Sequence, residues 1–326
     1  MPDVPLPHVY RVTKYDPADR APDGTYRGTQ DTNGDNGPVD AAYLAAVAAF
    51  AEESRIERFA VRDPQVGGGF GRLDPEGAID RAGPLGPFAD GFDGFYDGAP
   101  VTVPVALELV RMMNGDGGLW CRLEAEDAMT VEVGWDQYVY VGVRTPCEGA
   151  VARTHALGLF AEPIGASPYD PAQDEEYELR PADDVFWERV RASAARGEAG
   201  LIEENPAANA SRWHLVGPLD DEVRLDAIRA ALAPRARVYV WPPLSTDTAG
   251  LIAGLPEEFL LECVWEDADG RISSGHADDD DRTELARVLA GARAATLLPV
   301  FADDHDPLFT GVLPDADGVV RARWQL

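Results

Sequence analysis

The sequence predicts an α+β protein made of two mixed α/β sandwich domains with largely antiparallel sheets. Segments in which apolar and polar residues alternate run along the whole chain, and helical apolar stripes lie between them. An acidic, Pro-containing stretch separates two such groups. A length of 326 residues suits two domains of ordinary size. We therefore expect a first domain at 1–165, a linker at 166–182 and a second domain at 183–326.

The first domain is expected to mix helices and strands. Tyr43, Val47 and Phe50 recur at the spacing of one helix face, whereas 128–134 alternates as a half-buried strand does. Residues 63–100 are rich in Gly, Pro and Asp and predict mostly loop. By these criteria the strands are expected at 9–15, 56–63, 118–126, 128–134 and 137–143, and the helices at 40–53, from Pro104 onward and at 147–160.

The second domain is expected to be an open sandwich. Its elements run in an order close to β-α-β-β-α-β, which predicts a ferredoxin-like or related fold. The helices are expected at 184–196, 221–232 and 282–293, the strands at 211–216 and 237–241, and two hairpins at 258–275 and 307–324.

Charge is the most unusual property of the chain. Its 58 acids and 28 bases give a net charge of −30 and a pI near 4.3. Such a field repels nucleic-acid backbones and anionic membranes and attracts basic partners. Of the 28 basic residues only Lys14 is a lysine, which suits a GC-rich coding bias, so the acidity also fits a genomic or high-salt background.

The cysteines and the hydropathy pattern predict a cytoplasmic protein. Cys121, Cys147 and Cys263 are far apart, form no CxxC pair and leave an odd thiol, as expected in a reducing compartment. No apolar run approaches the ~20 residues of a membrane span. The segment MPDVPLPHVYRV lacks the basic start and apolar block of a secretory signal.

The stretch DTNGDNGPVD at 31–40 imitates a calcium-binding loop. An EF-hand that began at Asp31 would need Gly at its sixth position and Glu at its twelfth, where this chain has Asn36 and Ala42. Pro38 suits a first helical position and Asp40 suits the positive end of a helix dipole. The stretch therefore predicts a helix start, and no metal is expected there.

Two acidic motifs carry a metal alternative. HADDDDRTE at 276–284 and DDHDP at 303–307 combine a histidine with carboxylates that Mn²⁺ or Mg²⁺ could accept. Asp280 or Asp281 is also a natural N-cap for the helix that follows, and this capping role is the favoured interpretation. The chain has neither a GxSxG nor an HExxH motif, and GGGFGR at 67–72 precedes no helix, so the sequence predicts neither a catalytic residue nor a cofactor.

The segment WDQYVY offers a candidate partner-binding surface. Trp135, Tyr138 and Tyr140 cluster beside Asp136, and aromatic residues next to acids are common recognition points for cationic proteins. The same residues could form the edge of a packed sheet.

The segment RVYVW at 237–241 offers a candidate RNA-binding face. Arg237, Tyr239 and Trp241 alternate with two valines, and with Arg235 they would present an Arg/Tyr/Trp row on one side of a sheet. Exposed rows of this kind stack bases. A second layer over this face would make the same residues part of a core.

HVYRVTKYDPADR at 8–20 and VGWDQYVYVG at 133–142 resemble segments of uncharacterised proteins from high-GC soil bacteria, some of which are labelled RNA-binding. The resemblance covers the first half of the chain, to about residue 170. It implies no active site.

The leading hypothesis is an acidic, non-enzymatic binding protein that engages a basic protein partner, for example as an inhibitor or immunity protein. The alternatives are RNA binding through the Arg/Tyr/Trp row and a divalent-metal phosphodiesterase that would use Asp278–Asp281 or Asp303–Asp306. The oligomeric state is not predicted.

Overall fold

A computed structural model of the chain has an α+β fold with antiparallel sheets, as the sequence predicts. The chain divides into two compact units. The first contains described residues up to 169 and the second contains those from 180 onward. The boundaries expected at 165 and 183 stay a prediction. The structure describes residues 6–23, 25–30, 37–67, 86–88, 92, 94–115, 118–134, 137–169, 180–216, 222–300 and 306–322.

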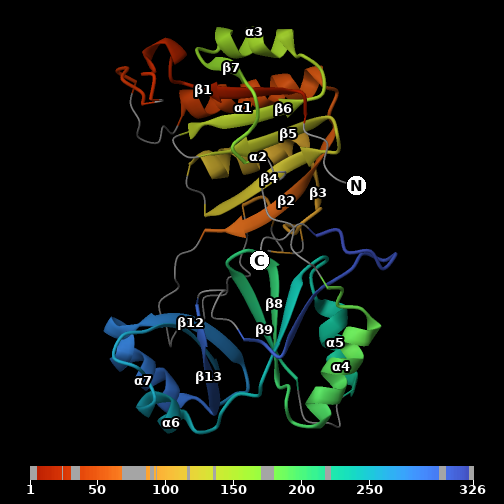
Figure 1. The fold of residues 1–326 in the computed structure, drawn as a ribbon, viewed down its shortest axis with the longest axis vertical. Helices are drawn as coiled ribbons and strands as arrows, with labels where there is room; N and C mark the ends of the chain where they lie inside the picture. The colour runs from red at the N-terminus through yellow and green to blue at the C-terminus, as the bar shows by residue number, and fades with distance from the viewer. Residues whose placement is uncertain are drawn as a thin grey trace. The chain divides into compact units, whose positions relative to one another are not determined.

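Unit 1 contains a sheet of seven strands in the described residues, in the order β3-β2-β4-β5-β6-β1-β7, and every pair is antiparallel (Figure 1). Within the described residues three α-helices accompany it, and Figure 1 shows α1 and α2 against one face. The strands are β1 His8–Thr13, β2 Arg58–Val66, β3 Pro100–Thr102, β4 Leu119–Ala125, β5 Met129–Val133, β6 Val139–Val143 and β7 Phe160–Ile164, and the helices are α1 Pro38–Glu53, α2 Val103–Asn114 and α3 Glu148–Ala156.

Helix α1 begins as the sequence predicts. Gly37 is the N-cap with a φ of 123°, Pro38 follows at the first helical position and Asp40 lies in the first turn. A positive φ of this size favours glycine at the cap. The EF-hand-like residues 31–36 lie outside the described residues.

The helix expected at 147–160 is shorter than predicted. It ends at Ala156, and Gly158 follows with a φ of 81°, the left-handed conformation that terminates many helices. The chain then forms β7, an edge strand that the sequence prediction missed. Pro163 within β7 obscured it, because proline in a strand is tolerated only at an edge or a bulge.

A network of buried charges lies on β2 and β4. Arg122, which is 3% exposed, places Nε 2.9 Å from Glu124 and Nη2 3.2 Å from Asp63. Arg62 joins Glu124 to the fully buried Asp97, at 3.1 Å from each carboxylate. Burial alone would lower the pKa of Arg122, but the surrounding carboxylates outweigh it and raise that pKa. Both guanidiniums therefore compensate buried acids.

Unit 2 contains two sheets in its described residues. The strand orders are β14-β10-β8-β9 and β12-β11-β13, again with antiparallel pairs. The predicted single ferredoxin-like sandwich is therefore wrong, because its strands divide between two sheets. The strands are β8 Leu201–Ala207, β9 Ala210–Leu215, β10 Arg237–Trp241, β11 Leu260–Glu266, β12 Ile272–Asp278, β13 Ala294–Pro299 and β14 Phe309–Val312, and the helices are α4 Asp184–Ala195, α5 Glu222–Ala231, α6 Thr248–Ala253 and α7 Arg282–Gly291.

The hairpin expected at 307–324 is also not formed as predicted. β14 pairs with β10, and described residues 319–322 are not in a strand. Residues 180–182, expected in the linker, lie against the other side of β14, where Pro181 bridges Val312 in parallel.

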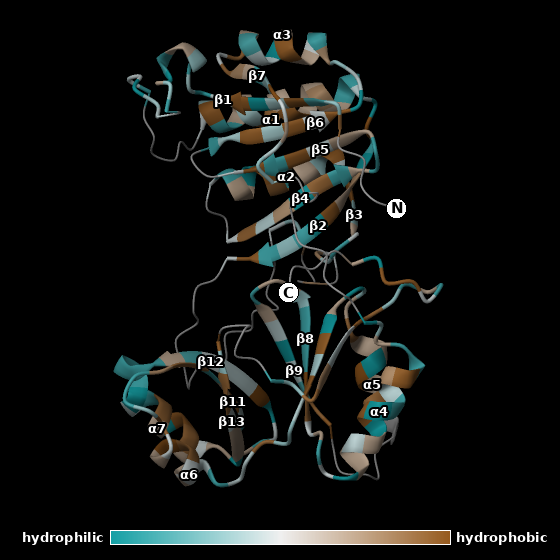
Figure 2. Ribbon diagram, viewed as in Figure 1, coloured by the Kyte–Doolittle hydropathy of each residue, from teal (hydrophilic) through white to brown (hydrophobic). Residues whose placement is uncertain are grey.

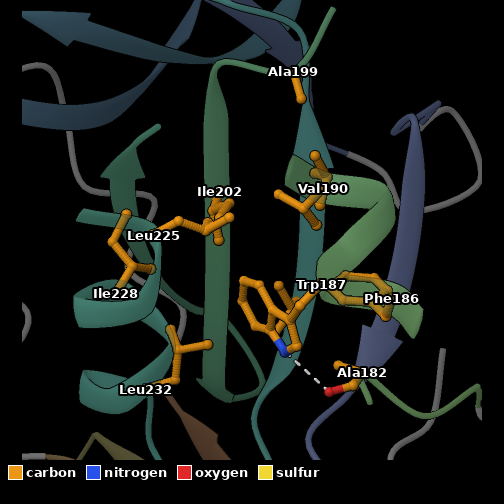
Figure 3. Packing of buried hydrophobic residues seen from close by; sticks show 11 residues of the cluster. Ala182, Phe186, Trp187, Val190, Ala199, Ile202, Leu225, Ile228 and Leu232 are labelled. Carbon is orange, nitrogen blue, oxygen red and sulfur yellow. Dashed lines mark hydrogen bonds between the residues drawn. The ribbon is translucent and has the colours of Figure 1, made fainter. Parts of the chain in front are cut away.

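The layers of unit 2 are helix, sheet, sheet and helix. Figure 1 shows α4 and α5 beside the β8 and β9 sheet, and α6 and α7 beside the β12 and β13 sheet. Between α4, α5 and the first sheet lies a core in which Trp187 donates a 3.0 Å hydrogen bond from Nε1 to the carbonyl of Ala182 (Figure 3). A second core joins α6 and α7 to the other sheet. Leu201, Trp241, Val264 and Leu298 form a third core between the two sheets.

None of the helices in the described ranges is both long enough and apolar enough to cross a membrane.

Candidate functional site

The aromatic surface of unit 1 is the first candidate. Tyr138 is partly exposed just before β6, whereas Tyr140 within β6 is only 8% exposed. Their ring centroids are 6.4 Å apart, and Tyr138 also contacts Tyr15 at 5.6 Å. Trp135 and Asp136, expected in the same surface, lie outside the described residues.

Two arginines of the same chain contact the Tyr138 ring. The guanidinium carbons of Arg11 and Arg20 lie 5.4 Å and 5.7 Å from its centroid. Arg11 is on β1, and Arg20 follows the short 3-10 helix after that strand. The sequence predicts that Tyr138 contacts the cations of a basic partner, and the chain's own Arg11 and Arg20 already make such a contact. Tyr138 therefore becomes part of a cationic site.

Both arginines bind one carboxylate on β7. Arg11 Nη2 and Arg20 Nη1 lie 2.6 Å and 3.0 Å from Glu162 Oε2. Partial burial would raise the pKa of Glu162, but the hydrogen bonds and charges of the two arginines outweigh it and lower that pKa. The sequence prediction missed this group, although Arg11 and Glu162 are directly paired in the β1–β7 register.

Lys14, the only lysine of the chain, directly follows β1, the strand that carries Arg11. It is 6% exposed, and its Nζ is 5.5 Å from the centroid of the Tyr15 ring.

The Arg/Tyr/Trp row of unit 2 is not an exposed face. Trp241 is 3% exposed and belongs to the core between the two sheets. Tyr239 is partly buried and packs against that core. Arg235 is held by Asp315 through hydrogen bonds of 2.7 Å and 2.9 Å, and Arg237 lies 6.0 Å from the Tyr239 ring centroid. The three-stranded sheet covers this face, so bases cannot stack on Trp241 in the folded protein.

A buried carboxylate lies beside this row. Glu203 on β8 is 4% exposed and pairs directly with Tyr239 on one side and Trp213 on the other. It accepts hydrogen bonds from Trp241 Nε1 and Asn205 Nδ2 at 3.0 Å each and from Ser211 Oγ at 2.9 Å. Burial and the nearby Glu262 raise the pKa of Glu203, and these three donors act in the opposite direction.

Glu203 should make the stability of unit 2 depend on pH. Because the folded protein binds the Glu203 proton more tightly than the unfolded chain, this carboxyl stabilises the fold least when it is ionised. We expect the free energy of unfolding of wild type, minus that of Glu203→Gln, to fall as the pH rises from 4.5 and then to level off above the folded pKa. Urea unfolding at a series of pH values measures this difference. A difference that is constant or rises with pH would show that the Glu203 pKa is not raised.

An acidic corner of unit 2 is the second candidate. It consists of the exposed residues Glu257, Glu258, Asp278, Asp279 and Asp280. The register places the two segments together, because Leu260 at the start of β11 pairs with Asp278 at the end of β12. Figure 2 shows a hydrophilic block where β12 leads into α7.

Arg282 is the base nearest to the acidic corner in sequence, and its guanidinium binds backbone carbonyl groups and not the carboxylates. Its Nη2 donates to the carbonyls of Pro256 and Glu257, and its guanidinium lies 5.1 Å from the Phe259 ring centroid. Within the part of the chain that the structure describes, none of the five acidic-corner residues forms a salt bridge. The five carboxylates of the corner are therefore not paired with a basic side chain in the described residues.

The acidic corner does not form a metal centre in the described residues. Asp278 caps the short 3-10 helix by accepting from the amide of Asp280, and Asp281 is the N-cap residue of α7. No group of three side chains that could hold a metal ion is found among the described residues. Asp303–His305 lie outside them.

No protein-family model matches the sequence, and no curated protein or solved structure is significantly similar to it. The functional argument therefore depends on the residues of this chain.

Proposed function

We propose that this protein is an acidic, non-enzymatic binding protein that engages a basic protein partner, as an inhibitor or immunity protein does. The observation that carries the proposal is the acidic corner, five exposed carboxylates without a salt bridge in the described residues. The net charge of −30 would steer a basic partner over a long range. The corner would then provide the local contact that fixes its orientation.

The acidic corner fits this role better than Tyr138 does. Exposed carboxylates keep their charge in water and are free to pair, whereas the Tyr138 ring is already in contact with Arg11 and Arg20. RNA binding is not favoured, because Trp241 is buried between the sheets.

The test uses a fluorescent decaarginine peptide as a defined basic probe. At low ionic strength the variant Glu257→Gln/Glu258→Gln/Asp279→Asn/Asp280→Asn should bind the peptide about tenfold more weakly than wild type, since exposed ion pairs each contribute a few tenths of a kcal/mol or more. The difference should shrink at about 0.15 M salt, where screening is strong. Asp278 and Asp281 are left unchanged because they lie at helix starts.

A matched control removes the same charge elsewhere. Glu57→Gln/Glu126→Gln/Glu188→Gln/Asp269→Asn neutralises four acids that are exposed but scattered. Its affinity for the peptide should fall by clearly less than that of the acidic-corner variant. Equal losses in the two variants would mean that only the overall charge matters, and the acidic corner would no longer be the docking point.

A further inference from the structure

Two cations meet one anion at the Arg11–Glu162–Arg20 group. Arg11 and Arg20 both donate to Glu162 Oε2, and neither forms a salt bridge with any other carboxylate in the described residues. Arginine stays protonated at every physiological pH. The group therefore has a net charge of about +1 on a chain whose overall charge is −30.

The arginines also have hydrogen-bonding capacity to spare. A guanidinium has five N–H donors. The buried Nε atoms of both Arg11 and Arg20 have no hydrogen-bond partner within the described residues. A buried donor without an acceptor costs free energy, so a ligand oxygen that reached these groups would be stabilised. The side chains of Arg11 and Arg20 are 22% and 11% exposed, which leaves them partly open to solvent.

The surroundings hold the two arginines in place. Arg11 belongs to β1, which is paired on both sides, with Tyr140 of β6 opposite it on one side and Glu162 of β7 on the other. Arg20 Nη2 lies 3.5 Å from the Tyr138 hydroxyl, and both guanidiniums pack against that ring. A pair of donors fixed in this way is pre-organised for an oxyanion.

We propose that Arg11 and Arg20 form a binding site for a phosphate group, and that Glu162 occupies this site when no phosphate is bound. Two guanidiniums balance the charge of a phosphate dianion. The two Nη groups that now donate to Glu162 Oε2 would each donate to a phosphate oxygen instead. Glu162 is on the edge strand β7 and is 30% exposed, so its side chain can turn toward solvent when the phosphate enters. This inference is independent of the acidic corner.

The test is a titration of the full chain with inorganic phosphate, followed by amide ¹H–¹⁵N NMR at constant ionic strength and pH 7.5. We expect saturable shifts at amides of β1, β7 and residues 19–21. Glu162→Gln should bind phosphate about tenfold more tightly, because a like charge next to the ligand is removed. Arg20→Ala should lose saturable binding, and Arg111→Ala, whose arginine pairs with Glu108 on α2, should bind as wild type does.

Two further arms separate the sources of the signal. Phenyl phosphate should bind more tightly than inorganic phosphate if the Tyr138 ring contacts the ligand, and equal affinities would assign the site to the phosphate group alone. Sodium acetate at the same ionic strength should produce weaker shifts. The proposal is overturned if wild type and Glu162→Gln both show no saturable shifts, or if Glu162→Gln binds no more tightly than wild type. Because these two proteins retain both arginines, the result does not depend on whether Arg20→Ala folds.

Discussion

Replacing Arg122 with Met is expected to lower the free energy of unfolding of unit 1 by about 3–5 kcal/mol, since removing one partner leaves buried charges uncompensated. Arg122 is 3% exposed and lies beside Asp63 and Glu124. Without it, Asp63 and Glu124 lose the Arg122 guanidinium, while Arg62 still pairs with Asp97 and Glu124. Methionine keeps most of the volume of the side chain, so the loss is electrostatic. Hydrogen–deuterium exchange of peptides from β2 and β4 measures it, with peptides from unit 2 as an internal reference.

Arg111→Met is the matched control for this experiment. Arg111 also pairs with a glutamate, Glu108, but both side chains are well exposed on α2. An exposed pair contributes about 0–1 kcal/mol, so this variant should be close to wild type. Similar exchange in the Arg111 and Arg122 variants would show that the Arg122 network is open to water and not a buried charge cluster.

Replacing Trp241 with Ala is expected to destabilise unit 2 by about 3–5 kcal/mol, as is usual when a large buried aromatic residue is truncated. Trp241 lies between the two sheets and donates from Nε1 to Glu203 at 3.0 Å. The variant therefore loses packing and also a hydrogen bond to a buried carboxylate. Urea unfolding measures the change.

Trp241→Phe separates the two contributions. It retains most of the packing and loses the donor to Glu203, so we expect a smaller cost of about 1–3 kcal/mol. If Trp241→Ala unfolds at the same urea concentration as wild type, Trp241 is exposed in solution. RNA retention by wild type and its loss in the variant would then become the next measurement.

The local elements of unit 1 follow from periodicity, but their ends and edges do not. The strand at 9–15 and the helix at 40–53 were predicted within a few residues, because their apolar spacing is regular. β7 was missed because Phe160–Ile164 is short and contains a proline. Gly158 was the available signal, since a glycine after a helix commonly marks its end.

The sheets of unit 2 could not be separated from the sequence. Alternation in RVYVW correctly identifies β10 and its two faces. It does not say what covers each face, because that depends on strands far away in the chain. Here β11 and β13 provide Val264 and Leu298 to cover the side that carries Trp241. The burial of Glu203 could not be predicted from the sequence either, because a glutamate usually occupies an exposed position.

The cationic site of unit 1 was only partly predictable. The cluster WDQYVY predicts Tyr138 as a partner-binding residue, which stays a prediction, and the structure places its ring against Arg11 and Arg20. Arg20 and Glu162 are 142 residues apart in sequence, and only the pairing of β7 with β1 brings Glu162 to Arg11. A search for arginines at strand positions would have identified Arg11, but its partners depend on the fold.

The position of Lys14 has a consequence for how this protein can be covalently marked. It provides the only ε-amine in the 326 residues, and it is 6% exposed. Acylation of Lys14, whether in an isopeptide bond to a degradation tag or by a succinimide-ester dye, needs its ε-amine to be accessible. Lys14 of the folded chain is therefore a poor acceptor for either, and acylation of Lys14 by such a dye reports that the end of β1 has opened.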